Sequence, residues 1–194
     1  LPRKVGHLLA TGADLKNTFC ISREDYGFIS HHIGDLENYE TYQSFMEAIA
    51  HYERIFRIKP TLLACDLHPD YFSTRYAIQR SQVESLPLYR IQHHHAHLAA
   101  CIADNRFNST HPVIGLCFDG TGYGTDGTIW GGEIIVGDYR NYHRQYHLEP
   151  FKLPGAEAAI RKPARIALSL LWQCDIPWDE QLQPVNAFSS TELE

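Results

Sequence analysis

The order in which strand-like and helix-like segments follow one another constrains this chain most. Three short apolar segments precede a helix near the N-terminus, and the same order returns after residue 112. The first copy continues into two further strand–helix pairs, whereas the second copy stops after its helix. Parallel strands connected through helices are typical of an α/β sheet, so the pattern predicts a duplicated α/β fold. A single irregular α/β domain without duplication is the alternative.

Hydrophobic periodicity and turn residues give the expected bounds of these segments. Apolar residues between Tyr42 and Phe56 recur at three and four positions and so share one helix face, with Asn38 as the N-cap. Pro163 fits the first turn of a helix because it has no N–H to lose there. The expected strands are His7–Thr11, Thr18–Ser22, Tyr26–Ser30, Thr61–Asp66, Pro87–Gln92, Val113–Asp119, Thr128–Val136 and Asn141–His147, and the other expected helices are Tyr71–Val83, His93–Asn105 and Pro163–Gln173.

Composition excludes several classes of protein. The 194 residues are enough to bury a core without a disulfide or a metal, and the longest apolar runs are far too short to cross a bilayer. The 17 basic and 23 acidic residues give a net charge of −6, which disfavours a nucleic-acid partner. Five cysteines without a CxxC motif indicate reduced, mostly buried thiols, and we expect a cytoplasmic protein with no membrane partner.

Four of the 12 histidines fall within five residues, directly after an expected strand. On a helix, His93 and His97 face the same way and can hold one metal ion. The pair His94 and His97 is a geometric rival, and His95 is expected to point elsewhere. The competing interpretation is a helix start at which imidazoles only cap backbone groups. The density of the cluster favours a metal site at the carboxyl edge of a sheet.

A glycine-rich segment, Asp119–Gly127, follows the strand that opens the second copy. Asp119 stands at the tip of that strand, where its carboxylate is a natural third ligand for a metal held by His93 and His97. Glycines let the backbone approach a ligand and present N–H groups to an anion. An ordinary hairpin with a capping aspartate is the alternative. The candidate ligand-binding residues here are Gly120, Thr121, Gly122, Gly124, Asp126 and Gly132, with an anion as the expected ligand.

Three other polar segments carry weaker signals. Lys16, in the first hairpin, is a candidate phosphate contact, although a solvated lysine in a turn explains it equally well. The segment Ser30–Asp35 is a polar loop that is not diagnostic alone. Arg161 offers a basic contact in a loop that is otherwise a plain connection. No catalytic residue is assigned from the sequence.

Four segments together resemble the HypF-type carbamoyltransferase family, in its Kae1-like domain. They are Gly12–Phe19 (GADLKNTF), His32–Asn38 (HIGDLEN), Gln92–Ala100 (QHHHAHLAA) and Asp119–Glu133 (DGTGYGTDGTIWGGE). The resemblance implies an actin/sugar-kinase/Hsp70-like (ASKHA) fold, in which two duplicated lobes enclose a nucleotide cleft. The family's HxxxH pair matches His93 and His97, and its DGTG aspartate matches Asp119.

The same resemblance implies a reaction. HypF-like enzymes make carbamoyl-adenylate from carbamoyl phosphate and ATP in a YrdC-like domain, and their Kae1-like domain transfers the carbamoyl group to the C-terminal cysteine of HypE. That group becomes a cyanide ligand of the [NiFe]-hydrogenase iron. A divalent metal, Zn²⁺ or Fe²⁺, is expected beside ATP or carbamoyl-adenylate as substrate. Because the acceptor thiol belongs to the partner, the chain's own cysteines are expected to be structural or spare.

The chain departs from the family pattern in three respects. Nothing matches the portions that precede this domain in HypF, and the second lobe is expected to stop soon after Trp172, before the last metal-binding aspartate. The loop usually written LPGGDAAIREP reads LPGAEAAIRKP, with Ala156 and Glu157. We therefore expect residues 1–110 to form the first lobe with the histidine-rich helix, and residues 111–194 to begin a truncated second lobe. Such a fragment is expected to be inactive alone.

Two alternative functions remain open. A threonylcarbamoyl transferase acting on tRNA shares the HxxxH core, but the net charge and the HHHAH and WGGE segments oppose it. A non-catalytic lobe that binds metal or nucleotide and docks on other domains is the other alternative.

Overall fold

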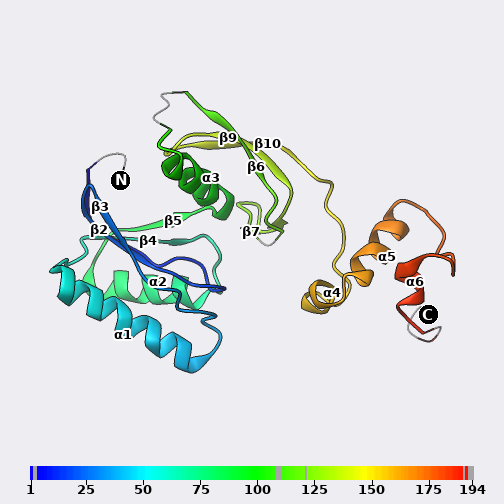
Figure 1. The fold of residues 1–194 in the computed structure, drawn as a ribbon, viewed down its shortest axis with the longest axis horizontal. Helices are drawn as coiled ribbons and strands as arrows, with labels where there is room; N and C mark the ends of the chain where they lie inside the picture. Colours follow the sequence, from blue (N-terminus) through cyan, green and yellow to red (C-terminus); the bar gives the residue numbers. More distant parts are fainter. Residues whose placement is uncertain (2–3, 108–110, 121, 190, 192–194) are drawn as a thin grey trace. The chain divides into compact units, whose positions relative to one another are not determined.

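A computed structural model describes residues 1, 4–107, 111–120, 122–189 and 191 of the chain. The chain divides into two compact units, Leu1–His147 and Leu148–Glu194 (Figure 1). The first unit carries two main sheets and the candidate site.

The larger sheet has five strands in the order β3-β2-β1-β4-β5. Strands β1 (Val5–Ala10), β2 (Cys20–Glu24) and β3 (Tyr26–Ile29) form an antiparallel meander. Strands β4 (Leu62–Asp66) and β5 (Leu88–Ile91) add in parallel beside β1. The carboxyl ends of β1, β4 and β5 therefore meet at one sheet edge, where α/β proteins place ligands.

Helices α1 (Tyr39–Phe56) and α2 (Phe72–Glu84) cover one face of this sheet (Figure 1). The predicted N-cap is confirmed, because the Asn38 side chain accepts a hydrogen bond from the Thr41 amide. The predicted apolar face of α1 is also confirmed, since Phe45 and Ile49 are buried against the sheet. The core cluster comprises Leu9, Phe19, Ile21, Leu36, Phe45, Ile49, Ile58 and Leu63.

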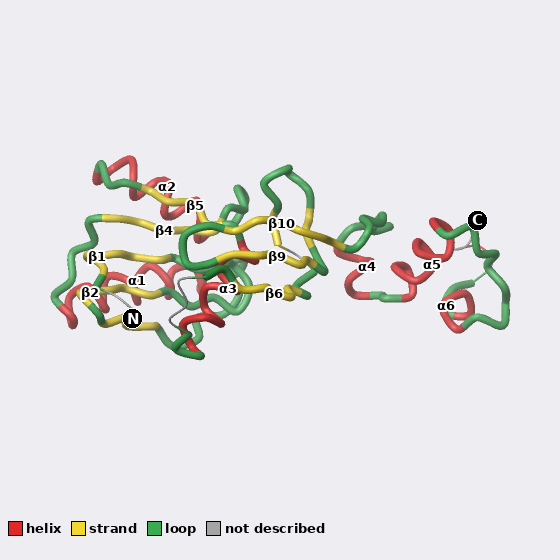
Figure 2. Tube along the Cα trace, turned by 90° about the horizontal axis from the view of Figure 1, so that it is seen from above, coloured by secondary structure: helices red, strands yellow, loops and turns green. Residues whose placement is uncertain are grey.

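The second sheet is a three-stranded antiparallel meander in the order β10-β9-β6. It comprises β6 (Val113–Cys117), β9 (Glu133–Gly137) and β10 (Tyr142–His147), which run side by side in Figure 2. Helix α3 (His93–Asp104) packs on β6 and β9 through Leu98 and Ile102. The order β10-β9-β6 repeats the order β3-β2-β1, which agrees with the predicted duplication of three-stranded units.

A small hairpin interrupts this second meander. Strands β7 (Gly122–Tyr123) and β8 (Ile129–Trp130) pair with each other and form a separate two-stranded sheet. The predicted single strand Thr128–Val136 is therefore wrong, because β8 and β9 are separate. Gly132 separates them with a φ of +78°, a left-handed conformation that glycine adopts without strain.

The second unit contains three helices, α4 (Glu157–Arg161), α5 (Ala164–Gln173) and α6 (Gln183–Asn186). The helix expected over Pro163–Gln173 is confirmed, although Pro163 occupies the N-cap instead of the first turn. Helices α4 and α6 were not predicted, since four or five residues are too few for a periodic pattern. Within the described residues, no helix combines the length and apolar character that crossing a lipid bilayer requires. The expected lobe boundary near residue 110 stays a prediction.

Candidate metal centre

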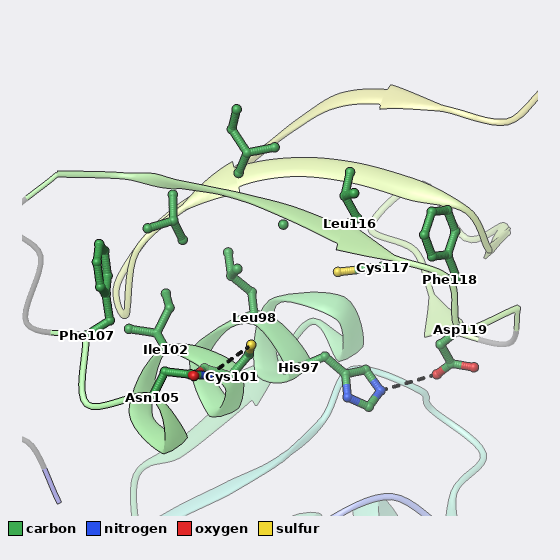
Figure 3. Close-up of a pocket in the computed structure, with 13 residues that line it drawn as sticks. His97, Leu98, Cys101, Ile102, Asn105, Phe107, Leu116, Cys117, Phe118 and Asp119 are labelled. Atoms are coloured by element: carbon green, nitrogen blue, oxygen red, sulfur yellow. Dashed lines mark hydrogen bonds and ion pairs between the residues drawn. The ribbon is translucent and has the colours of Figure 1, made fainter.

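Three elements of the first unit bring four polar side chains together. Asp66 ends β4, His93 and His97 lie on the first two turns of α3, and Asp119 follows β6. Figure 3 shows His97 at one end of α3, with its ring directed toward Asp119. The predicted pairing of a four-residue histidine spacing with an aspartate at a strand tip is therefore found in the structure.

The distances within this cluster are short. His93 Nε2 lies 2.8 Å from Asp119 Oδ2, and His97 Nε2 lies 3.2 Å from His93 Nε2 and 3.4 Å from Asp119 Oδ2. One donor atom from each of the three residues lies within 4.8 Å of the other two. Two imidazole nitrogens and one carboxylate oxygen suit Zn²⁺ or Fe²⁺. The geometry therefore fits the expected divalent ion.

The electrostatic environment of the cluster is negative. A hydrogen bond with Asp66 raises the pKa of His93 against the opposing effect of burial, and the charges of Asp66 and Asp119 raise it further. Burial, and then the carboxylates of Asp66, Asp14 and Asp119, raise the pKa of Tyr71 to about 12. The Tyr71 phenol is therefore protonated at neutral pH and can donate a hydrogen bond.

The remaining histidines of the cluster have structural partners. His94 is fully buried; its Nε2 donates to the Asp119 carbonyl at 2.9 Å, and its Nδ1 lies 3.2 Å from Gln92 Nε2. The rival pair His94 and His97 is thus not the pair that faces Asp119. His95 points elsewhere, as expected, since its Nε2 contacts the Asp138 carbonyl.

The glycine-rich segment packs tightly against the protein itself. A Cβ atom at Gly122 would lie 2.2 Å from His94 Cε1, and one at Gly124 would lie 2.1 Å from Trp130 Nε1. The Gly124 amide already donates to the Thr128 carbonyl. Close packing thus explains these glycines without a ligand, whereas Gly120 has open space beside it. Their binding roles stay predictions.

The remaining predicted binding residues lie in the hairpin, in the turn after it, and on the exposed surface. Asp126 accepts hydrogen bonds from Thr128 and Trp130 within the hairpin. Those hydrogen bonds lower its pKa, although burial alone would raise it. Gly132 forms the turn between β8 and β9, and Thr121 lies outside the described residues. Lys16 is exposed and lines neither of the two cavities beside His97.

Two cavities adjoin the cluster. A groove of about 740 Å³ runs between α3 and β6, with His97 and Asp119 at one end and apolar side chains such as Leu98 and Ile102 along it (Figure 3). A smaller cavity of about 300 Å³ lies between the first sheet and α3, and its polar wall is Asp66, His93 and His97. Both cavities are thus lined by candidate metal ligands, the first by His97 and Asp119 and the second by His93 and His97.

Sequence reasoning missed three residues of this site. Asp66 contacts His93, and the Gln92 side chain caps α3 by accepting from the His95 amide at 2.9 Å. The third residue is Tyr71, whose pKa is raised by burial and by the charges of the carboxylates. An available signal for Asp66 was its position at the end of an apolar strand, the same signal that identified Asp119.

The cysteines only partly match the expectation. Cys65 and Cys117 are buried, and burial raises the pKa of each thiol. Cys101 and Cys174 are exposed, so the expectation of mostly buried thiols is wrong for these two. The described cysteines are all free thiols.

Comparison with family models places this site in a Kae1-like domain. The model of the HypF Kae1-like domain matches residues 3–104, and the model of the carbamoyltransferase Kae1-like domain, second subdomain, matches residues 115–193. The chain belongs to the HypF carbamoyltransferase family. The first match contains His93 and His97, and the second contains Asp119.

Similar proteins support this assignment. Carbamoyltransferase HypF2 of Cupriavidus necator is 44% identical over 171 residues, which cover 88% of this chain and 21% of the relative. Carbamoyltransferase HypF of Rhizobium leguminosarum is 47% identical over 164 residues, covering 84% of this chain and 21% of the relative. This chain thus spans about a fifth of the length of these curated relatives.

Solved structures agree. The crystal structure of full-length HypF in the phosphate- and nucleotide-bound form has a TM-score of 0.79 at 45% identity, covering 87% of this chain and 26% of that one. The structure of T. kodakarensis HypF has a TM-score of 0.81 at 35% identity, covering 88% and 22%. The expected α/β fold of the ASKHA type is confirmed by these similarities.

Proposed function

We propose that the protein to which this chain belongs transfers a carbamoyl group from carbamoyl-adenylate to a cysteine thiol. The relatives carry the name carbamoyltransferase HypF, and one similar HypF structure is a nucleotide-bound form. The proposed acceptor is the C-terminal cysteine of a HypE-like protein, where the carbamoyl group is the precursor of a cyanide ligand of [NiFe]-hydrogenase. Carbamoyl phosphate and ATP are the proposed source of the adenylate, through a YrdC-like domain.

The convergence of His93, His97 and Asp119 is the observation that carries the proposal. Their donor atoms lie within 4.8 Å of one another and come from two segments that the family models match separately. These three residues would hold a Zn²⁺ or Fe²⁺ ion. When bound, such an ion supplies a Lewis acid that polarises a carbonyl oxygen.

The residues around the cluster support binding of a small polar group. The 300 Å³ cavity beside His93 and His97 has walls of small side chains that leave room for a carbamoyl group. Open space beside Gly120 supports approach of the adenylate to the backbone there. The small residues of the cavity are Ala10, Gly12, Ala13, Ala64 and Ala96.

Metal analysis tests the ion site. The variants His93→Ala and His97→Ala should each retain less Zn²⁺ or Fe²⁺ than the wild-type chain, whereas the matched control His95→Ala should retain it. His95 is a fair control because it neighbours both ligands but contacts the Asp138 carbonyl instead. Equal metal content in all three variants would refute the assignment.

Transfer itself is tested in the full-length protein. With added carbamoyl-adenylate, mass spectrometry of the acceptor peptide should show a gain of one carbamoyl group at its cysteine, and His97→Ala should abolish that gain. A non-catalytic lobe predicts an unmodified acceptor peptide despite bound metal.

A further inference from the structure

Asp66 is a buried carboxylate beside the cluster that the proposed reaction does not use. Its side chain is 7% exposed. Oδ1 accepts a hydrogen bond from the His68 amide at 2.8 Å, and Oδ2 lies 2.6 Å from His93 Nδ1. One oxygen is therefore fixed by the backbone, while the other faces the ring of a candidate ligand.

This contact determines where the His93 ring carries its proton. An ionised carboxylate only accepts hydrogen bonds, and each nitrogen of His93 faces one: Nδ1 lies 2.6 Å from Asp66, and Nε2 lies 2.8 Å from Asp119. Asp66 makes the shorter contact and is the more buried of the two carboxylates, so it favours the neutral His93 ring with its proton on Nδ1. The lone pair is then on Nε2, the atom that lies 2.8 Å from Asp119 and 3.2 Å from His97. Histidines that bind metals commonly donate their other N–H to a carboxylate in this way.

We infer that Asp66 is a positioning residue, which holds His93 in the Nδ1–H tautomer and aims the Nε2 lone pair at the ion. The inference rests on the metal site proposed above and adds a residue to it. Asp66 also lines the 300 Å³ cavity proposed for the carbamoyl group, but its effect on the ion is exerted through His93.

The two histidine ligands differ in this respect. The His93 side chain is 17% exposed and is held at both nitrogens, whereas the His97 side chain is 56% exposed. Within the part of the chain that the structure describes, the contacts of His97 involve Nε2 and none involves Nδ1. His93 is therefore the ligand whose ring the protein fixes at both nitrogens, whereas the contacts of His97 fix its ring at Nε2.

The fold gives Asp66 this position. Strands β4 and β5 are parallel, and their register sets Asp66 opposite Ile91. The chain enters α3 two residues after Ile91, at His93. The carboxylate of one strand thus reaches the first residue of the helix that follows the neighbouring strand.

Replacing Asp66 by asparagine tests the inference with little change in shape. If the side-chain carbonyl of the introduced asparagine keeps the hydrogen bond from the His68 amide, its NH₂ group faces His93 Nδ1 and favours the opposite tautomer, with the proton on Nε2. Asp66→Asn should then lower Zn²⁺ affinity by about 10- to 100-fold, as loss of such partners typically does. Asp70→Asn is the matched control, because Asp70 is exposed and paired with Arg75.

Two measurements on the 194-residue chain separate this inference from the proposed function. Competition with a chromophoric chelator gives the affinity for Zn²⁺ alone, and ¹⁵N NMR of the metal-free protein, at a pH where the ring is neutral, gives the His93 tautomer. We expect Nδ1–H in the wild type and in Asp70→Asn, and Nε2–H in Asp66→Asn, whose circular dichroism spectrum should match the wild type.

Each outcome is decisive. An Nδ1–H signal with unchanged Zn²⁺ affinity in folded Asp66→Asn would overturn the positioning role. A wild-type chain that binds neither Zn²⁺ nor Fe²⁺ would overturn the metal site, while the tautomer measurement would still decide whether Asp66 orients His93. If Asp66→Asn does not fold, an Nε2–H tautomer in the wild type is sufficient to refute the inference.

Discussion

Removing Arg144 should destabilise the chain more than removing any exposed arginine. Glu133, on β9, is 1% exposed, and its two oxygens accept from Arg144 at 2.6 and 2.9 Å. The guanidinium also lies 4.1 Å from the centre of the Trp130 ring. Arg144→Ala would leave a buried carboxylate without its counter-charge.

The expected cost follows from what remains around Glu133. Breaking a buried ion pair by removing one partner costs about 3–5 kcal/mol. The Gly131 amide still donates to Glu133, and the Arg144 side chain is 23% exposed, so water can reach the vacated space. We therefore expect a loss near the lower end, about 3 kcal/mol in the free energy of unfolding.

Urea unfolding followed by far-ultraviolet circular dichroism measures this loss. Arg75→Ala is the matched control, since it removes an arginine from an exposed pair with Asp70 and should cost about 0.5 kcal/mol. Adding Glu133→Gln to Arg144→Ala removes the stranded charge and should restore about 1 kcal/mol. The reasoning is refuted if Arg144→Ala costs no more than Arg75→Ala, or if the second substitution makes the loss larger.

Three further predictions concern packing, pH and thiols. Gly122→Ala should cost about 1–3 kcal/mol in urea unfolding because its new Cβ meets a buried ring, while Gly120→Ala, with open space, should cost almost nothing. Folding lowers the pKa of Asp126, so the ionised side chain stabilises the folded chain. The free energy of unfolding of the wild type should therefore exceed that of Asp126→Asn by its full amount above the unfolded pKa of about 4, and the difference should disappear as pH falls through the folded pKa. A difference that grows in acid would contradict this prediction. Iodoacetamide should label the exposed thiols of Cys101 and Cys174 fast and the buried thiols of Cys65 and Cys117 slowly, as measured by peptide mapping. Equal labelling rates at the four cysteines would show that burial does not control their reactivity.

Much of the first unit was predictable because its hydrophobic periods are regular. The apolar face of α1 and the apolar runs of β4 and β6 are clear enough to locate these elements within a few residues, although Ile114 and Leu116 of β6 are exposed. The break between β8 and β9 was not predictable, since two glycines such as Gly131 and Gly132 can also lie within one irregular strand. Only the structure shows that the chain turns at Gly132.

The part of the candidate site that lies within one helix was predictable from the sequence. His93 and His97 follow from helical spacing within a single segment, whereas Asp66 depends on which strand lies beside β5. Asp66 and His93 are 27 residues apart, and neither spacing nor composition records their contact. Lateral strand order is a tertiary property, so the residue that orients a ligand was harder to find than the ligand itself.

The burial of His94 has a consequence for how this segment tolerates mutation. Its ring joins α3 to the backbone of Asp119 through one hydrogen bond, and Gly122 packs directly against it. In a library that randomises His93–His97, selection for correct folding alone would already deplete variants at position 94. Selection for metal binding would add depletion at positions 93 and 97. Position 94 would thus be depleted by selection for folding, and positions 93 and 97 by selection for metal binding. Counting the histidines in this segment would therefore overstate the number of metal ligands.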